Sequence, residues 1–140
     1  VLAHATKAFA ALTCGSFISL RPDYDEKDQP TLRGVRPGGE SLDVEAMSEG
    51  TVDQLYLALR IGALEHYLSN NEPMPFIADD VLVKFDDRRT AAAMRLFADL
   101  SDRTQVLYFT HHESVVEAAR AIEVESPGRV FIQDLSDTAV

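Results

Sequence analysis

The sequence has no tryptophan, one cysteine and few cations. A lone Cys14 excludes an internal disulfide and a cysteine cage for a metal, and it is typical of proteins in a reducing cytoplasm. The 13 Lys and Arg face 23 Asp and Glu, for a formal net charge of −10. Such a surface is poorly suited to gripping the phosphates of nucleic acid. No apolar run approaches the roughly 20 residues that a membrane span needs, so we expect a cytoplasmic protein with no membrane contact.

The 140 residues are enough for one globular domain with a sizeable core. Apolar residues make up 46% and charged residues 26% of the chain, which is the balance of a soluble globular protein. The sequence starts at Val1 with neither a methionine nor a signal-peptide pattern. We therefore expect it to be a piece of a longer protein.

The first third of the chain predicts a helix followed by a small antiparallel sheet. Residues 1–12 are rich in alanine and favour a helix, which Gly15 can terminate. Short alternating segments separated by turn residues follow up to residue 46. Strands of an antiparallel meander are expected at 16–20, 31–35 and 41–45.

The remainder predicts helices and strands in alternation. Helical spacing of apolar residues marks 51–69, 88–103 and 113–122, whereas short apolar runs typical of buried strands occupy 74–79, 105–110 and 129–135. From Glu72 onward this order predicts an α/β sheet of parallel strands with right-handed crossovers. The expected fold class is therefore α/β, with the antiparallel meander at its N-terminal side.

An acidic cluster lies in "PFIADDVLVKFDD", residues 75–87. Asp79 and Asp80 end one predicted strand, and Thr110 with His111 ends the next. Ligands of open α/β sheets bind beyond these carboxyl ends. Asp79 could hold Mg²⁺, and Asp80 could orient or deprotonate an attacking water. Alternatively, Asp79 caps a turn and the other carboxylates are only solvated.

Asp86 and Asp87 have a simpler explanation. Acidic residues favour the first turn of a helix, and a helix is expected to begin near Arg88. From the residues alone, helix capping is the favoured interpretation of this second acidic pair.

The segment "MSEGTVDQ", residues 47–54, precedes the long predicted helix. Its Ser48-x-Gly50 pattern would point backbone N–H groups and the helix dipole at an anion such as phosphate. Alternatively, Thr51 and Gln54 form a T-x-x-Q capping box, which would explain half of the motif without a ligand. Spacing leaves both interpretations open.

Three motifs in order carry a family resemblance: "MSEGTVDQLYLALRIG", "PFIADDVLVKFDD" and "VLYFTHH". Together they resemble the C-terminal lobe of an ABC-type ATPase head. The resemblance is to the SMC-like, coiled-coil ATPases of DNA repair and chromosome maintenance, including the bacterial AAA-like coiled-coil group. It covers about residues 1–133. It implies one domain over 1–140, with the end of a coiled-coil arm at 1–12, a β-meander at 16–46, the signature loop and helix at 47–70, and the Walker B, D-loop and switch-histidine region at 74–140.

The resemblance implies roles for the residues at the strand ends. Asp79 would be the Walker B carboxylate that positions Mg²⁺. Asp80 stands where the family most often has the catalytic glutamate, and its shorter side chain reaches less far. His111 would be the switch histidine that senses the γ-phosphate of ATP, with His112 as the alternative.

The resemblance also implies contacts across two heads. Ser48, Glu49 and Gly50 would form the signature loop, which touches the γ-phosphate of ATP bound to the opposite head. Asp86 would be the D-loop aspartate at the interface between the heads. Glu49 departs from the family, where glycine is common, and its charge would repel a triphosphate unless it turns outward.

The phosphate loop G-x-x-x-x-G-K-[ST] is missing. The segment "GVRPGGES", residues 34–41, matches it except that Glu40 replaces the lysine, and a carboxylate there would repel phosphates. The resemblance places the true loop in an N-terminal ATPase lobe of the same polypeptide. ATP and Mg²⁺ are therefore not expected to bind tightly to this chain alone. A second ATPase head would be an ATP-dependent partner, and DNA, if bound, would be held by other regions.

Two other functions are compatible with parts of the sequence. The chain could be a non-catalytic interaction module that keeps the fold without turnover. A receiver-like domain, in which Mg²⁺ and a phosphoaspartate share a pocket, also uses acidic residues at strand ends. That domain needs its acidic pair at the first strand and a lysine after a later strand, and no lysine follows Lys84.

Overall fold

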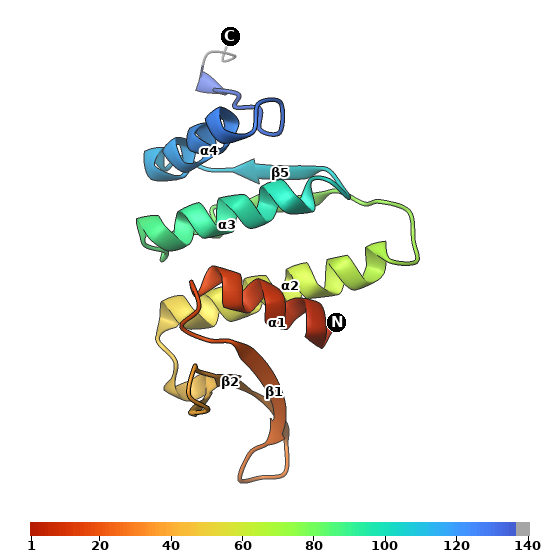
Figure 1. Cartoon of the computed structure of the whole chain (residues 1–140), viewed down its shortest axis with the longest axis vertical. Coiled ribbons are helices and arrows are strands. Elements are labelled where there is room, and N and C mark those ends of the chain that lie inside the picture. Colours follow the sequence, from red (N-terminus) through yellow and green to blue (C-terminus); the bar gives the residue numbers. More distant parts are fainter. Residues whose placement is uncertain (137–140) are drawn as a thin grey trace.

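The computed structural model describes residues 1–136 (Figure 1); residues 137–140, the end of the predicted 74–140 region, lie outside the described part. A helix and an antiparallel meander come first, and helices alternate with strands after them. The elements are α1 (Leu2–Leu12), β1 (Ser19–Tyr24), β2 (Pro30–Val35), β3 (Ser41–Asp43), the 3₁₀ turn η1 (Val44–Ala46), α2 (Glu49–Leu68), β4 (Phe76–Asp79), α3 (Asp87–Leu100), β5 (Val106–Phe109) and α4 (Glu113–Glu125).

The helices α1 and α2 form the centre of the molecule. Ala5 and Phe9 of α1 are fully buried. The two helices approach so closely that a Cβ added to Gly62 of α2 would lie 2.5 Å from the backbone nitrogen of Ala5. Small side chains at the crossing are therefore required. Among the described helices, none has the length and apolar character to cross a bilayer, the 20 residues of α2 included.

The meander is antiparallel, as predicted, with strand order β1-β2-β3. The expected strand at 16–20 is wrong in its bounds, because β1 runs from Ser19 to Tyr24 through residues predicted as a turn. The ring of Phe17 packs on the ring of Phe9 at 5.1 Å instead of extending the strand. The turn is formed by Asp25, whose Oδ1 accepts from the N–H groups of Lys27 and Gln29. The predicted strand at 41–45 likewise ends early, at Asp43.

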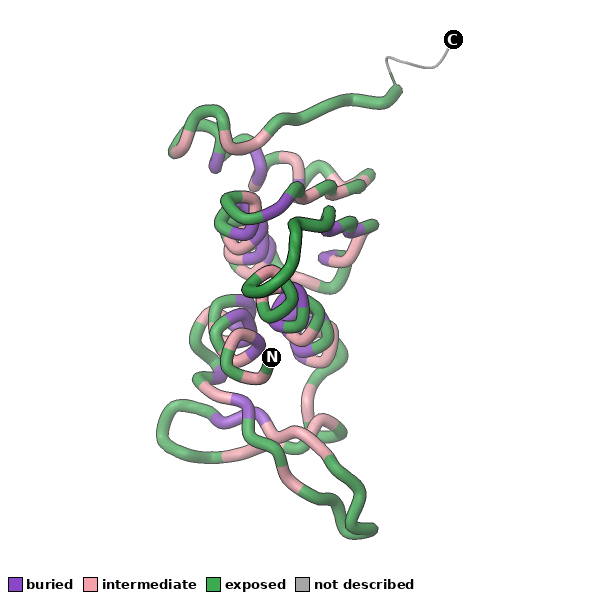
Figure 2. The backbone as a smooth tube through the Cα atoms, turned by 90° about the vertical axis from the view of Figure 1, so that its right-hand side faces the viewer, coloured by how far each residue is buried: buried purple, intermediate pink, exposed green. Residues whose placement is uncertain are grey.

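The strands β4 and β5 pair in parallel, as predicted, with Phe76 opposite Val106 and Asp79 opposite Phe109. One face of this pair packs on α3, where the ring of Phe97 lies 5.7 Å from the rings of Phe76 and Tyr108. The other face is open. It carries Ile77, Leu107 and Phe109, all exposed. Figure 2 shows buried residues concentrated on the helices and exposed residues along much of the rest of the chain.

The predicted strand at 129–135 is wrong, because no strand forms there within residues 1–136. Arg129 holds this segment against the end of α3, donating to the carbonyl of Ala98 at 2.8 Å and pairing with Asp102 at 2.7 Å. Phe131 beyond it is 88% exposed. An apolar run becomes a strand only beside a partner edge, and Arg129 anchors this one to a helix.

Candidate functional site

Asp80 follows the last residue of β4 and leaves the strand direction. Its φ is 47°, in the left-handed region that few residues other than glycine adopt, although aspartate tolerates it better than most. Its N–H still donates to the carbonyl of Phe109 at 2.9 Å, one residue beyond the β4–β5 ladder. The backbone therefore ties Asp80 to the end of β5.

The side chain of Asp80 is enclosed by three consecutive residues after β5. The Thr110 hydroxyl donates to Asp80 Oδ1 at 2.6 Å, and His111 Nδ1 lies 2.6 Å from Asp80 Oδ2. His112 Nε2 is 3.9 Å from the same oxygen, and the His112 N–H donates to Thr110 Oγ1 at 3.0 Å. The strand ends thus bring together the predicted residues Asp80 and His111, and both carboxylate oxygens are engaged.

These contacts set the charge state of the carboxyl group. The hydrogen bond from Thr110 is the largest cause that holds the pKa of Asp80 below its usual value. The charges of His111 and His112 act in the same direction, against partial burial. Burial raises the pKa of Tyr108 to about 12, so its hydroxyl keeps its proton and accepts from the N–H of Leu82 at 3.2 Å. The site therefore combines an ionised carboxylate with a neutral phenol behind it.

Asp79 ends β4 with an exposed side chain. Within residues 1–136 its carboxylate takes part in no hydrogen bond or ion pair, unlike that of Asp80. A carboxylate with open oxygens fits Mg²⁺, which binds through one or two carboxylates together with phosphates and waters. The chain offers Asp79 as the donor for such an ion.

Helix α2 is capped by Ser48, not by Thr51 and Gln54, so of the two interpretations left open the T-x-x-Q capping box is wrong. Ser48 Oγ accepts from the Thr51 N–H at 3.2 Å and lies 2.9 Å from Thr51 Oγ1. The helix begins at Glu49, two residues earlier than predicted, which places Thr51 inside its first turn. Gln54 is fully buried, and its amide has no hydrogen-bond partner in the described part of the chain.

The predicted signature loop lies against the segment that follows Asp80. Lys84 Nζ is 3.2 Å from Glu49 Oε2 and 3.8 Å from Asp53 Oδ2. The hydrogen bond to Glu49 is the largest cause that raises the pKa of Lys84. A Cβ added to Gly50 would lie 3.2 Å from the Lys84 carbonyl oxygen. The charge of Glu49, expected to repel a triphosphate, is therefore paired with a cation.

The sequence analysis did not identify Lys84 as a residue of the site. The feature that could have indicated it is an isolated lysine between the two acidic pairs of residues 75–87. It also lines a hollow of about 290 Å³ between α2 and residues 80–84, which Tyr56, Arg60 and Asp80 line as well.

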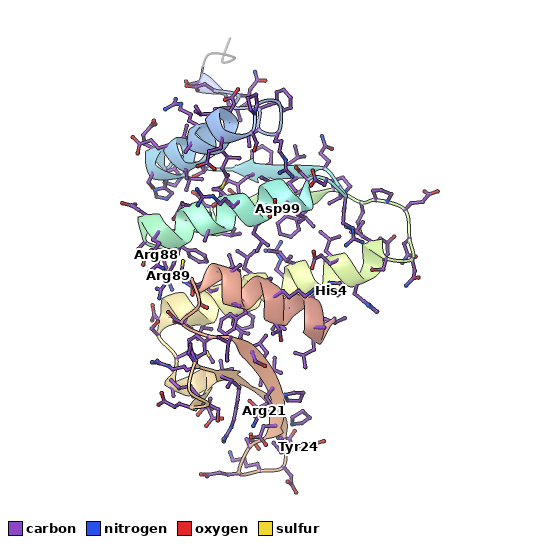
Figure 3. All side chains as sticks on the ribbon, viewed as in Figure 1. His4, Arg21, Tyr24, Arg88, Arg89 and Asp99 are labelled. Atoms are coloured by element: carbon purple, nitrogen blue, oxygen red, sulfur yellow. The ribbon has the colours of Figure 1, made fainter. Side chains whose placement is uncertain are left out.

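Asp86 lies outside the Asp80 group and serves as the N-cap of α3. Its Oδ1 accepts from the Arg89 N–H at 2.8 Å, and Asp87 is the first residue of the helix. The capping interpretation of this second acidic pair is therefore confirmed. Arg88 and Arg89 mark this end of α3 in Figure 3.

Ser48→Ala is expected to lower the free energy of unfolding by about 1 kcal/mol, because α2 loses its capping hydrogen bond. Urea denaturation followed by circular dichroism measures this change. Ser114→Ala, an exposed position in the first turn of α4, is the control and should change stability by less than about 0.5 kcal/mol. Equal stability of the two variants would contradict the capping role of Ser48.

No known protein-family profile matches the chain. It is 31% identical over 125 residues to the uncharacterized protein YhaN of Bacillus subtilis (strain 168), covering 89% of this chain and 13% of YhaN. A Pyrococcus furiosus Smc head domain with an extended coiled coil, bound to the C-terminal domain of ScpA, matches 84% of this chain and 29% of its own, at a TM-score of 0.63 and 19% identity. The Thermotoga maritima SMC head domain matches at a TM-score of 0.61 and 22% identity, and the match covers 84% of this chain and 40% of that chain.

A further structure, from work on ATP-driven dimerization and DNA-stimulated activation of SMC ATPases, matches at a TM-score of 0.63 and 16% identity, over 84% of this chain and 73% of its own. At these identities the likeness establishes a shared fold. The chain has the fold of the corresponding part of SMC head domains, and it spans about an eighth of the length of YhaN.

Proposed function

We propose that this chain is the C-terminal half of an ATP-binding and ATP-hydrolysing head of the SMC-like ABC kind. The head would belong to a longer cytoplasmic polypeptide of DNA repair or chromosome maintenance. The observation that carries the proposal is the meeting of two strand ends. Asp80, directly after Asp79 at the end of β4, contacts Thr110, His111 and His112 after β5, on a fold shared with SMC head domains.

The residues at the strand ends would have different roles in ATP hydrolysis. Asp79 would hold Mg²⁺, which supplies charge stabilisation to the transferred phosphoryl group when bound. Asp80 would orient the attacking water and accept its proton. Because Thr110 and His111 occupy both oxygens of Asp80, one of these bonds must open first. The bond from His111 to Asp80 Oδ2 is the one expected to open, since the His111 side chain is 79% exposed.

The open face of the β4–β5 pair supports an N-terminal lobe as partner. Ile77, Leu107 and Phe109 form an exposed apolar face on this two-stranded sheet. A sheet this small is marginal by itself, and contiguous exposed apolar surface marks an interaction site. We assign this face to the N-terminal ATPase lobe of the same polypeptide, which would also carry the phosphate loop.

A second head is the partner proposed for the start of α2. Ser48 and Gly50 lie at the N-terminus of a 20-residue helix, which favours an anion such as the γ-phosphate held by the opposite head. Asp86, exposed at the N-terminus of α3, would face the same interface. ATP-driven dimerization of SMC ATPases supports this arrangement. With a net charge of −10, the chain would leave any DNA contact to other regions.

The isolated chain is expected neither to bind ATP tightly nor to hydrolyse it, because it has no phosphate loop. Equilibrium dialysis with ATP and a phosphate-release assay measure both properties, with and without Mg²⁺. The full-length polypeptide is expected to show Mg²⁺-dependent binding, and Asp79→Asn in it should abolish that dependence. Robust Mg²⁺-dependent turnover by the 140-residue chain would refute the proposal.

A further inference from the structure

Three potential metal ligands converge where β4 and β5 end. One ligand atom from each of Asp80, His111 and His112 lies within 4.8 Å of the other two. The two imidazole rings are neighbours, with centroids 4.1 Å apart. We propose that these three residues bind a late first-row divalent metal ion of the Zn²⁺ class.

The spacing of the ligand atoms suits such an ion. Zn²⁺ bonds nitrogen and oxygen at about 2.0–2.2 Å in a tetrahedron, which separates its ligand atoms by about 3.3 Å. The two distances from Asp80 Oδ2, 2.6 Å to His111 Nδ1 and 3.9 Å to His112 Nε2, bracket that value. All three ligand atoms lie within 4.8 Å of one another, so side-chain rotations would bring them to bonding distance and leave the fourth position to water.

The groups behind the ligands are already in place. The Thr110 hydroxyl holds the other oxygen of Asp80 at 2.6 Å, and the His112 N–H donates to that hydroxyl at 3.0 Å. Hydrogen bonds of this kind orient metal ligands and add substantially to metal affinity. The backbone hydrogen bond from the Asp80 N–H to the Phe109 carbonyl holds the Asp80 main chain at the end of β5, directly before the residues that carry the two imidazoles.

The donor set distinguishes this site from a Mg²⁺ site. Two imidazoles and one carboxylate suit Zn²⁺ and its neighbours, whereas Mg²⁺ prefers oxygen donors alone. Asp80 is 22% exposed and His111 79% exposed, so an ion can enter from solvent. The Zn²⁺-class site involves the 140-residue chain only and does not depend on the proposed ATPase.

One consequence does rest on the proposed function. An ion bound to Asp80 and His111 would prevent both side chains from acting on the attacking water and the γ-phosphate of ATP. Zn²⁺ would then inhibit ATP turnover of the full-length polypeptide. Binding measured on the isolated chain keeps the two proposals separable, because it needs no ATP.

Isothermal titration of the 140-residue chain with Zn²⁺, in a buffer free of chelators, tests the site. We expect one ion per chain and no saturable binding of Mg²⁺ at the same position. His112→Gln leaves the contact between Asp80 and His111 in place and should weaken Zn²⁺ binding more than about tenfold. Thr110→Val should weaken it about tenfold or more by freeing the Asp80 carboxylate. His66→Gln, an exposed histidine of α2, is the matched control and should bind as the unchanged chain does.

Circular dichroism is used to check that each variant is folded. Should a variant not fold, nuclear magnetic resonance of the unchanged chain gives the answer, since Zn²⁺ must shift the imidazole signals of His111 and His112 but not that of His66. The proposal is overturned if Zn²⁺ does not bind saturably, if His112→Gln binds as tightly as the unchanged chain, or if these two imidazole signals do not move.

Discussion

Asparagine in place of Asp80 is expected to lower ATP turnover of the full-length polypeptide by about 10²–10⁴-fold, the usual contribution of a general base. Asparagine keeps the size of the side chain, and its carbonyl can still accept from Thr110. It has no negative charge, however, and cannot take a proton from the attacking water. Phosphate release at saturating Mg²⁺ and ATP measures the loss, while ATP binding should be retained because Asp79 is unchanged.

Asp99→Asn is the matched control for this experiment. Asp99 is an exposed aspartate of α3 whose Oδ1 lies 3.6 Å from Arg129, and it is labelled in Figure 3. The same chemical change there should leave turnover unaltered. Near-normal turnover of the Asp80→Asn polypeptide, with Asp99→Asn equally active, would contradict the role proposed for Asp80.

Phe9→Ala is expected to lower the free energy of unfolding by about 3–5 kcal/mol. The Phe9 ring is fully buried in α1 and packs on Phe17 at 5.1 Å. Its loss would open a cavity between the central helices and the meander. Since domains of this kind are stable by only about 5–15 kcal/mol, the variant should be close to unfolding. Urea denaturation followed by circular dichroism measures the shift.

Phe131→Ala removes the same ring from a site where it is 88% exposed. This control should change stability by less than about 0.5 kcal/mol. A comparable loss in both variants would mean that the α1–α2 centre does not carry the stability we assign to it.

Local patterns predicted most elements of the fold. The apolar runs before Asp80 and Thr110 became the parallel strands β4 and β5, because a short buried strand is marked by its own residues and the turns beside it. The helix predicted at 88–103 appears as Asp87–Leu100, capped by Asp86. The run ending at Leu135 followed the same pattern but formed no strand within residues 1–136, where Arg129 holds its start against α3 and no strand edge pairs with it.

The candidate site was predictable in part. The order of strands and acidic residues was enough to expect Asp80 near His111, since parallel strands end at one edge of a sheet. The cation beside Glu49 could not be expected, because Lys84 lies 35 positions away in the sequence. Nor did the pattern indicate that Ser48, and not Thr51, caps α2, since both offer a hydroxyl near the start of the helix.

The amino-acid order was sufficient for the helices, the two kinds of sheet and the places where acidic side chains follow strands, because these depend on neighbours a few positions apart. Which residues those side chains contact was decided only by the tertiary structure, because the contacts join distant parts of the chain. Asp80 meets Thr110 across 30 positions of chain, and such a contact exists only after β4 and β5 have paired in register and aligned their ends.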